Sequence, residues 1–453
     1  MSTALAAPPA AEELRHRRER LLEELPPDAL VLVRGAVPDL ASRRFRQSNE
    51  LYFLTGLEVP GAYLLLDGLK GRSSVYLPHR SAPRERSEGP ILACEDVDHV
   101  LELTGVVSVA GPEQLPLDLA SILFRSSRPT FVPFAPAEGA ATSRDSALAA
   151  AAWQAADPLC AIGSAEAALI DGLARQFPRC DVRDLSPVLD TLRLHKSPYE
   201  LELLRTAARI CGEATLEAMR STAVGVYEYE LEAVANFVYR KSGAAGSGYE
   251  AIVAGGSNAW HGHYNANDAP LCDGDLVLMD YAPDYRYYTS DIGRMWPVNG
   301  RYTEEQRQLY GFVLAYHREL LARIRPGATA ARILAEAAGA MRDALAQMEF
   351  SKDIHRAACE RALDFPGHLS HPVGMSVHDV GSYAEFEFEP GLVFSVDPMI
   401  WVPEEQLYVR VEDTIAVSAD GVENLTGFVA LEMDDVEAEM REPGLLQLWD
   451  ERA

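Results

Sequence analysis

One hairpin-like segment, residues 276–298, limits the possible folds of this chain most strongly, because it holds two carboxylates around a single turn. Apolar and aromatic stretches flank a turn predicted at Pro283–Tyr285, and Asp280 and Asp291 lie symmetrically about it. Residues directly opposite each other in an antiparallel pair project from the same face, with Cβ atoms roughly 5 Å apart. Like charges at that separation need a cation, so the pattern predicts a cation site on one face of a sheet.

A second segment, residues 392–417, repeats this pattern. Asp397 and Glu412 lie symmetrically about the turn-like sequence PEEQ, so their side chains are also predicted to face each other. Glycines mark matching positions in the two halves. Gly225 and Gly327 each begin a helix-like stretch. Gly274 and Gly391 each precede the first aspartate of a hairpin by six positions. The sequence therefore predicts an internal duplication that brings four carboxylates together.

The four carboxylates, together with His371 from a loop, form a set of possible metal ligands that is mostly oxygen. Such a set suits Mn²⁺, Co²⁺ or Zn²⁺ better than a structural zinc site made of thiolates. Two ions ~3.5 to 4 Å apart bridge a water, lower its pKa and stabilise the oxyanion of a tetrahedral intermediate. A single acidic residue at a strand end is ordinarily a solvated turn residue, so the prediction of hydrolysis depends on the symmetric pairs.

The motifs around these residues resemble the pita-bread metallopeptidases of family M24, above all Xaa-Pro aminopeptidase (aminopeptidase P) and its close relative prolidase. The resemblance is dense over residues 248–265 (GYEAIVAGGSNAWHGHYN), 274–300, 367–381 (GHLSHPVGMSVHDVG) and 409–414 (VRVEDT). It extends into the N-terminal half through residues 46–66 (RQSNELYFLTGLEVPGAYLLL), which are similar to the N-terminal domain of aminopeptidase P. Methionine aminopeptidases lack that domain and fit poorly.

The resemblance implies a role for each acidic residue. Asp280 binds one metal, Asp291 chelates both ions, Glu412 bridges them, and His371 is the lone imidazole ligand. Asp397 stands where the family has a glutamate that binds metal and serves as the base toward the bridging water. Its side chain is one methylene shorter, and we expect it to remain a ligand and catalytic residue.

The resemblance also implies four supporting residues. Arg410, two positions before Glu412 on the same face of its strand, is expected to orient a ligand carboxylate, and Tyr249 to be its hydrogen-bonding neighbour. His263 and His378 match the histidines that hold the substrate and stabilise the tetrahedral intermediate. Many relatives have a histidine at the position of Gly367; whether His368, one position later, replaces it stays open.

The expected fold is an α/β N-terminal domain, residues 1–185, followed by an α+β pita-bread catalytic domain, residues 186–453, with an internal pseudo-twofold duplication. In the N-terminal domain, residues 11–25 read as an amphipathic helix. Strands are predicted within residues 29–35, 62–68, 73–79 and 130–136. A helix is predicted in the Ala-rich stretch around Leu148 and Trp153, and these two side chains are expected to pack against the domain. Near the junction, Ser197, Pro198 and Glu200 predict a helix start, as do Thr303 and Gln306 further on.

Net charge, apolar runs and cysteine spacing disfavour nucleic-acid binding, a membrane span and a disulfide framework. A formal net charge of −27 over 453 residues disfavours binding to nucleic acid through its phosphates. No apolar run approaches the ~20 residues of a membrane span, and the N-terminus lacks the pattern of a secretory signal, so we expect a cytoplasmic protein that binds no membrane. The six cysteines are scattered and form no CxxC pair, which argues against a disulfide framework.

The resulting prediction is a metal-dependent enzyme, a hydrolase that cleaves the N-terminal Xaa-Pro bond of peptides with two divalent ions. The family favours Mn²⁺ and a homodimer or homotetramer, and the expected partners are peptides with proline at the second position. One alternative is an Xaa-Pro dipeptidase (prolidase). A more remote alternative is a pita-bread scaffold without catalysis, which would have lost the ligand set, whereas all five positions here keep side chains that bind metals.

Overall fold

The computed structural model describes residues 9–37, 45–124 and 126–450. It divides into two compact units, Met1–Arg193 and Leu194–Ala453. The observed boundary after Arg193 lies eight residues beyond the predicted boundary after residue 185. Most of helix α8 (Ser186–Leu194) therefore belongs to the N-terminal unit.

The N-terminal unit is built on a six-stranded mixed sheet with strand order β4-β3-β2-β1-β5-β6. β1, β5 and β6 run parallel, β3 and β4 run parallel, and β2 is antiparallel to both of its neighbours. The four predicted strands are confirmed as β1, β2, β3 and β5. The strands span Leu30–Arg34 (β1), Tyr63–Asp67 (β2), Arg72–Tyr76 (β3), Ser108–Ala110 (β4), Pro129–Val132 (β5) and Asp181–Asp184 (β6).

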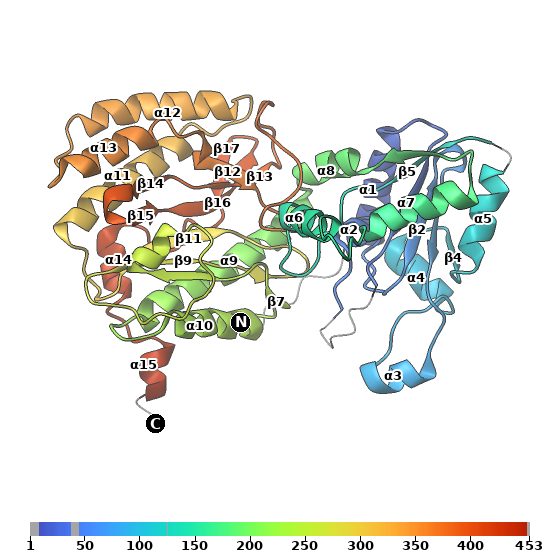
Figure 1. The fold of residues 1–453 in the computed structure, drawn as a ribbon, viewed down its shortest axis with the longest axis horizontal. Helices are drawn as coiled ribbons and strands as arrows, with labels where there is room; N and C mark the ends of the chain where they lie inside the picture. The colour runs from blue at the N-terminus through green and yellow to red at the C-terminus, as the bar shows by residue number, and fades with distance from the viewer. Residues whose placement is uncertain (1–8, 38–44, 125, 451–453) are drawn as a thin grey trace. The chain divides into compact units, whose positions relative to one another are not determined.

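Helices connect these strands and cover the sheet (Figure 1). The apolar core lies between the sheet and two of them, because Leu119 of α5 and Leu173 of α7 pack against buried strand residues such as Leu32 and Val132. The helix predicted at residues 11–25 is confirmed as α1. The helices span Ala11–Glu23 (α1), Asn49–Thr55 (α2), Ala82–Glu88 (α3), Val97–Thr104 (α4), Gln114–Leu123 (α5), Arg144–Ala155 (α6) and Ala165–Gln176 (α7).

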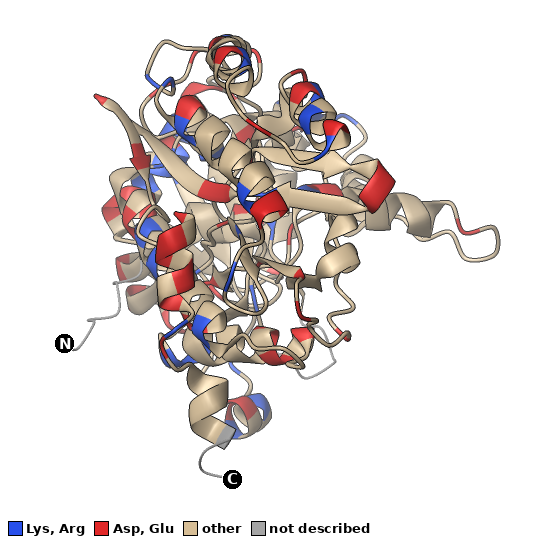
Figure 2. Ribbon diagram, turned by 90° about the vertical axis from the view of Figure 1, so that its left-hand side faces the viewer, with Lys and Arg blue, Asp and Glu red and all other residues tan. Residues whose placement is uncertain are grey.

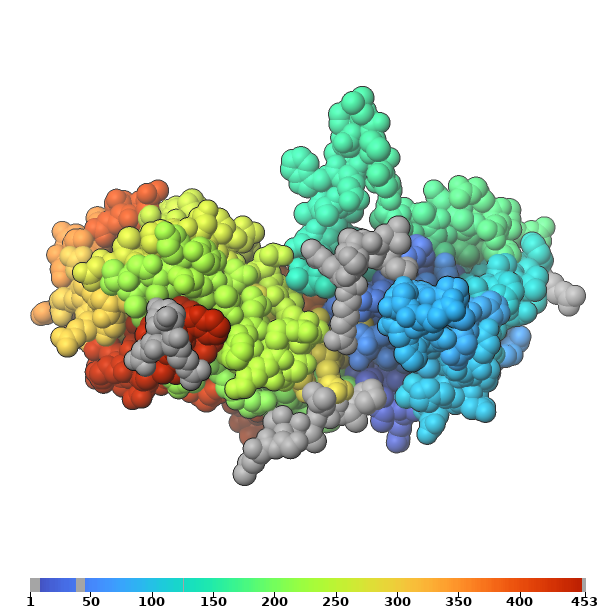
Figure 3. Space-filling model, turned by 90° about the horizontal axis from the view of Figure 1, so that it is seen from below, coloured from blue at the N-terminus to red at the C-terminus, as the bar shows by residue number. Residues whose placement is uncertain are grey.

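The prediction that Leu148 and Trp153 pack into a core is wrong. Both lie on α6, where Leu148 is 48% and Trp153 81% exposed, and Leu159 beyond the helix is 97% exposed. Alanine occupies most other positions of α6, so the helix has no apolar stripe that would orient these two side chains inward. Figure 3 shows this segment standing out from the N-terminal unit.

The C-terminal unit contains a sheet with strand order β12-β13-β16-β11-β9-β8, and β17 pairs with β16. The order has an internal twofold pattern, because β8, β9 and β11 on one side of the β11–β16 contact correspond to β12, β13 and β16 on the other. Two short pairs, β7 with β10 and β14 with β15, complete the unit. The strands span Gly246–Ser247 (β7), Ile252–Gly255 (β8), Leu276–Asp280 (β9), Pro283–Asp284 (β10), Ile292–Pro297 (β11), Leu369–Pro372 (β12), Val393–Val396 (β13), Met399–Val402 (β14), Leu407–Arg410 (β15), Glu412–Ser418 (β16) and Gly421–Asn424 (β17).

The helices repeat in the same way. Two packed helices, α9 and α10, precede the first three strands, and α11 and α12 precede the second three; Figure 1 shows each pair beside its half of the sheet. Gly274 and Gly391, the glycines six positions before an aspartate, have φ of 88° and 93°, so the repeat extends to backbone conformation. The helices span Pro198–Ser221 (α9), Glu228–Lys241 (α10), Glu304–Leu321 (α11), Ala330–Leu345 (α12), Asp353–Ala362 (α13), Met433–Glu439 (α14) and Leu445–Asp450 (α15).

Both predicted helix starts are confirmed. Ser197 accepts a hydrogen bond from the Glu200 amide and Thr303 accepts one from the Gln306 amide, and each of these N3 side chains accepts one in return. Acidic and basic residues both occur along the helices (Figure 2), and Arg332 and Glu336 form one ion pair between successive turns. None of the helices in the described ranges combines the length and the apolar character needed to cross a bilayer.

Candidate metal centre

The first hairpin forms, but its register differs from the prediction. Asp280 at the end of β9 pairs with Gly293 on β11 and not with Asp291. The reversal occurs at Arg286 and Tyr287, which have φ of 53° and 74° and form a two-residue turn of the kind that twisted hairpins favour. Pairing of Asp280 with Asp291 requires a turn centred between Tyr285 and Arg286, and the observed turn is centred one residue later. A shift of one residue at the turn moves the partner by two positions. Because the shift is even, Asp291 stays on the same face as Asp280.

The second hairpin has the predicted register. Met399 pairs with Arg410 on β14–β15, and Val396 pairs with Asp413 on β13–β16, so the two ladders share one register. Asp397 and Glu412 lie opposite each other where the chain passes from one ladder to the other. The reversal occurs at the predicted PEEQ sequence, residues 403–406.

Gly293 is the residue that joins the two hairpins. It pairs with Asp280 on one side and with Glu412 on the other, so these two carboxylates flank a position that has no side chain. A Cβ atom at Gly293 would lie 3.0 Å from Nε of Arg410 and 3.1 Å from Oε2 of Glu412. The missing side chain therefore leaves the space into which the acidic side chains and Arg410 project.

His371 on β12 completes a cluster of three possible metal ligands. Ligand atoms of Asp291, His371 and Glu412 all lie within 4.8 Å of one another, and Nε2 of His371 is 3.3 Å from Oδ2 of Asp291. Nδ1 of His371 lies 3.2 Å from the carbonyl oxygen of Pro372. A carbonyl oxygen can only accept, so Nδ1 carries the proton and Nε2 keeps its lone pair toward the carboxylates.

Arg410 connects the other carboxylates to this cluster. Its guanidinium is 3.0 Å from Oδ2 of Asp280, donates to Oδ1 of Asp397 at 2.8 Å, and also donates to Oε2 of Glu412. Tyr249 donates to Oδ1 of Asp280 at 2.7 Å and to Oδ1 of Asp291 at 3.0 Å. All five predicted ligands are thus brought together. Asp291, His371 and Glu412 meet directly, Asp280 is linked to them through Arg410 and Tyr249, and Asp397 is linked through Arg410.

The charges in this site are unbalanced. Four buried carboxylates surround one guanidinium, so full ionisation of the four would leave three negative charges uncompensated among these site residues. Burial raises the pKa of Asp291 well above its ordinary value and the charge of Asp280 raises it further; burial also raises the pKa of Asp397 and of Glu412. Burying like charges without counterions is costly, so this donor set fits bound cations.

Two further observations fit a metal centre. Oε1 of Glu412 is buried and has no hydrogen-bond partner in the described part of the chain, as expected for an oxygen reserved for a ligand. Burial lowers the pKa of His371, which keeps its imidazole neutral and able to coordinate at neutral pH. The residues therefore fit the divalent ions that an oxygen-rich set binds.

The residue that fixes the backbone of Asp291 is Thr414, which was not among the predicted site residues. Oγ1 of Thr414 accepts a hydrogen bond from the Asp291 amide at 2.8 Å and donates one to the Asp291 carbonyl oxygen at 2.7 Å. Thr414 lies on β16, two residues after Glu412, within the VRVEDT motif. That spacing places it on the same strand face as Glu412, a signal that was present in the sequence.

His378 and His263 extend the site beyond the carboxylates. The rings of His371 and His378 have centroids 4.0 Å apart, and those of His378 and His263 are 6.2 Å apart. The Asp379 amide donates to the carbonyl oxygen of Pro372 at 2.8 Å, which closes the loop and brings His378 against His371. Beneath this loop, Asp379 forms a buried ion pair of 3.2 Å with Lys196.

His368, whose role the sequence left open, lies in the apolar core. It is fully buried, its Nε2 is 2.7 Å from the carbonyl oxygen of Ala362, and its ring packs edge-on against Tyr316 and Phe365. Its own carbonyl oxygen accepts a hydrogen bond from the Asp397 amide. His368 thus supports the backbone of Asp397, and its ring lies outside the three-residue ligand cluster.

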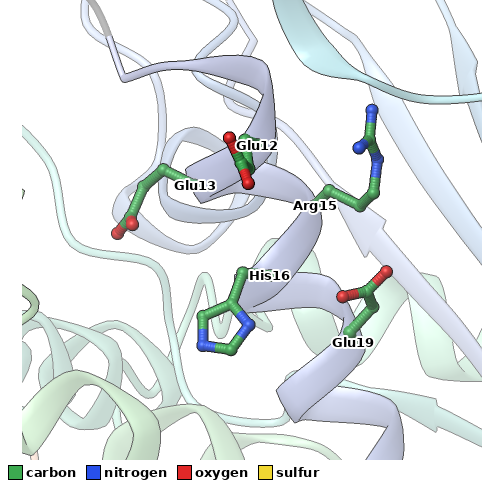
Figure 4. Close-up of a pocket in the computed structure, with 5 residues that line it drawn as sticks. All are labelled: Glu12, Glu13, Arg15, His16 and Glu19. Atoms are coloured by element: carbon green, nitrogen blue, oxygen red, sulfur yellow. The ribbon is translucent and has the colours of Figure 1, made fainter.

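A separate hollow lies along α1 of the N-terminal unit (Figure 4). All of its lining side chains come from one stretch of that helix, and they are charged or polar: Glu12, Glu13, Arg15, His16 and Glu19. None of the predicted site residues lines it. It is the solvated face of α1, and we assign it no function.

Two family models match the chain: Aminopeptidase P, N-terminal domain over residues 14–130, and Metallopeptidase family M24 over residues 202–419. The Xaa-Pro aminopeptidase of Escherichia coli (strain K12) is 30% identical over 95% of this chain and 97% of its own length. The Xaa-Pro aminopeptidase of Haemophilus influenzae is 29% identical over 96% and 99%. A structure of aminopeptidase P from E. coli with the inhibitor Pro-Leu aligns with a TM-score of 0.76 and 28% identity over 96% of this chain and 99% of that one. The chain therefore belongs to metallopeptidase family M24, within its aminopeptidase P group of metallo-exopeptidases.

Proposed function

We propose that this enzyme removes the N-terminal residue from peptides whose second residue is proline, at a centre of two divalent metal ions. The observation that carries the proposal is the convergence of four buried carboxylates and His371 around a point where like charge is left uncompensated. Membership in an aminopeptidase P group supports the reaction, and the donor chemistry supports the metals.

Asp280, Asp291, His371, Asp397 and Glu412 are the residues that would hold the ions. Divalent ions bound there would supply Lewis-acid chemistry, lowering the pKa of a water and polarising the scissile carbonyl group. We propose Mn²⁺ as the natural metal, since oxygen-rich sites of this kind accept it, although geometry and availability also decide which ion is bound.

The remaining chemistry belongs to side chains of this chain. Asp397 would accept the proton of the attacking water, because its carboxylate shares the Arg410 guanidinium with the carboxylate of Glu412. Arg410 keeps the carboxylates of Asp397 and Glu412 in position through its hydrogen bonds. After attack, the proton on Asp397 passes to the imino nitrogen of the departing proline.

His378 and His263 are proposed to bind the substrate. The ring of His378 lies 4.0 Å from that of His371 and 6.2 Å from that of His263, measured between centroids, so both histidines would line the approach to the carboxylates. A hydrogen bond from an imidazole to the peptide carbonyl oxygen would stabilise the negative charge that develops on it during attack. His263 is exposed and free to meet an incoming substrate.

The preference for proline is supported by a related structure. Aminopeptidase P from E. coli was solved with the inhibitor Pro-Leu, a peptide that begins with proline. We infer that this chain recognises proline on the leaving side of the scissile bond in the same way. As for assembly, we propose a homodimer or homotetramer, since closed symmetry is usual for soluble homo-oligomers.

The test compares peptide pairs that differ only at the second residue. Chelator-treated protein is reconstituted with Mn²⁺ and given Xaa-Pro-Yaa and Xaa-Ala-Yaa, and the products are identified by mass spectrometry. We expect release of Xaa from the proline peptide alone, and loss of release when the metal is removed again. Equal cleavage of both peptides, or full activity in the chelated protein, would contradict the proposal.

A further inference from the structure

We propose that His79, Cys94 and Glu95 of the N-terminal unit form a second metal site, suited to Zn²⁺ and separate from the catalytic centre. One ligand atom from each of these side chains lies within 4.8 Å of the other two. The site is at the carboxyl edge of the parallel strands β3 and β4, where α/β sheets commonly bind ligands. A thiol, an imidazole and a carboxylate are a donor set that selects zinc over harder ions.

The distances are close to those of a coordination sphere. Nδ1 of His79 is 2.7 Å from Oε1 of Glu95 and 3.2 Å from Sγ of Cys94. Neighbouring ligand atoms around a tetrahedral zinc ion are about 3.4 Å apart, given bond lengths of about 2.0 to 2.3 Å. Small movements of side chains would therefore suffice to place an ion between the three atoms. A fourth position remains for water, since His79 and Glu95 are about half exposed.

Glu113 orients the histidine from its other side. Its carboxylate lies 3.2 Å from Nε2 of His79. A carboxylate that accepts a hydrogen bond from one ring nitrogen leaves the other nitrogen with its lone pair free, which is the usual arrangement behind a metal-bound histidine. Gly111 makes room for this carboxylate, because a Cβ atom there would lie only 2.3 Å from Oε1 of Glu113.

Backbone hydrogen bonds hold the three contributing loops together. The Leu77 amide donates to the Ala110 carbonyl oxygen at 3.0 Å, and the Cys94 amide donates to the Pro78 carbonyl oxygen at 3.1 Å. The Arg80 amide donates to Oε2 of Glu95 at 3.0 Å, which fixes the carboxylate and leaves Oε1 toward His79. The ligand atoms are thus positioned by the fold before any ion binds.

The simpler alternative is an exposed histidine paired with two glutamates. Such a pair explains Glu95 and Glu113, but it gives no role to Cys94, whose sulfur meets the same ring nitrogen as Glu95. Cys94 is also the member of the group that is buried, at 9% exposure. A metal ion accounts for all three atoms that converge on one point.

Cobalt distinguishes the two alternatives optically. The full-length protein, reduced and treated with chelator, is titrated with Co²⁺, whose bond to a thiolate gives a charge-transfer absorption in the near ultraviolet. The proposed catalytic ligands are oxygens and an imidazole and give no such band. We expect the band in the unchanged protein, its loss on adding Zn²⁺, and its absence in Cys94→Ser and His79→Gln.

Matched controls are available in the same chain. Cys160→Ser and His99→Gln replace exposed residues of the same types outside the cluster and should keep the band. The zinc content after dialysis should fall by one ion per chain in Cys94→Ser, and its peptidase activity should be unchanged, which separates this site from the proposed function. If Cys94→Ser does not fold, His79→Gln carries the same expectation. A protein without the band, or a band of equal strength in folded Cys94→Ser or His79→Gln, would overturn the proposal.

Discussion

Arg410 occupies the place where the negative charges of the metal centre meet. It is buried and contacts Asp280, Asp397 and Glu412, so a single guanidinium offsets part of their repulsion. Its planar fork of donors suits this task better than the point charge of a lysine. The remaining negative charge is what makes the site attractive to divalent ions.

Asp291 is the residue whose loss should affect the centre most. It contacts His371 and Tyr249, and it is the proposed ligand shared by both ions. We predict that Asp291→Ala abolishes both metal retention and turnover, measured by metal analysis after dialysis and by a peptide cleavage assay. The matched control, exposed Asp435→Ala on α14, should retain both. Normal activity in Asp291→Ala would show that the site is wrongly assigned.

Asp397 tests whether the shorter carboxylate serves as the base. In Asp397→Asn the shape is kept but the proton acceptor is lost, so kcat should fall on the order of 10²–10⁴-fold. In Asp397→Glu the carboxylate is kept and one methylene longer, and activity should stay within roughly tenfold. Steady-state kinetics of the two variants would decide, and an equal loss in both would favour a purely geometric role for Asp397.

The sequence predicted the two hairpins better than their registers. In the second hairpin, symmetry about the turn gave the correct partner, because the chain keeps one register from Val396–Asp413 through Met399–Arg410. In the first, two residues with positive φ moved the turn. Arg286 and Tyr287 are not the residues that usually adopt this conformation, so the sequence held no signal for the shift.

The observed register of the first hairpin places Gly293 between Asp280 and Glu412. Gly293→Ala would place a methyl group 3.0 Å from Nε of Arg410 and 3.1 Å from Glu412. We predict a loss of roughly 10- to 100-fold in metal affinity, the range seen when neighbours of ligands are changed, measured by competition with a chelator. Gly339→Ala is the control: it lies on α12 with open space around it and should stabilise the protein by about 0.5–1 kcal/mol. Unchanged affinity in Gly293→Ala would contradict the assigned geometry.

The internal repeat accounts for how residues far apart in the sequence meet in the fold. Asp280 and Asp291 come from one half and Asp397 and Glu412 from the other, and β11 and β16 join the halves at the centre of the sheet. Spacing in the sequence revealed the repeat, but the contact between the halves depends on tertiary pairing. The roles of Thr414 and Gly293 follow from that contact: spacing places Thr414 on the same strand face as Glu412, but only the pairing of the halves brings it to the backbone of Asp291.

The raised pKa values predict how metal binding depends on pH. In the metal-free protein, burial raises the pKa of Asp291, Asp397 and Glu412, so the folded chain holds protons that the unfolded chain releases. The metal-free protein should therefore lose stability as pH rises above the ordinary carboxyl range of about 4, and metal binding should release protons. Thermal unfolding with and without Mn²⁺ should show a larger stabilisation by metal at pH 8 than at pH 5. An equal stabilisation at both values would argue against protonated carboxylates in the empty site.

The most direct test of the proposed activity offers the enzyme two substrates at once. Mn²⁺-loaded protein is mixed with equimolar Xaa-Pro dipeptide and Xaa-Pro-Yaa tripeptide that carry distinguishable Xaa residues, and the released amino acids are quantified by mass spectrometry. We predict that Xaa is released chiefly from the tripeptide. Cleavage of the dipeptide alone would make the enzyme an Xaa-Pro dipeptidase, and no cleavage of either would contradict a catalytic role for the metal centre.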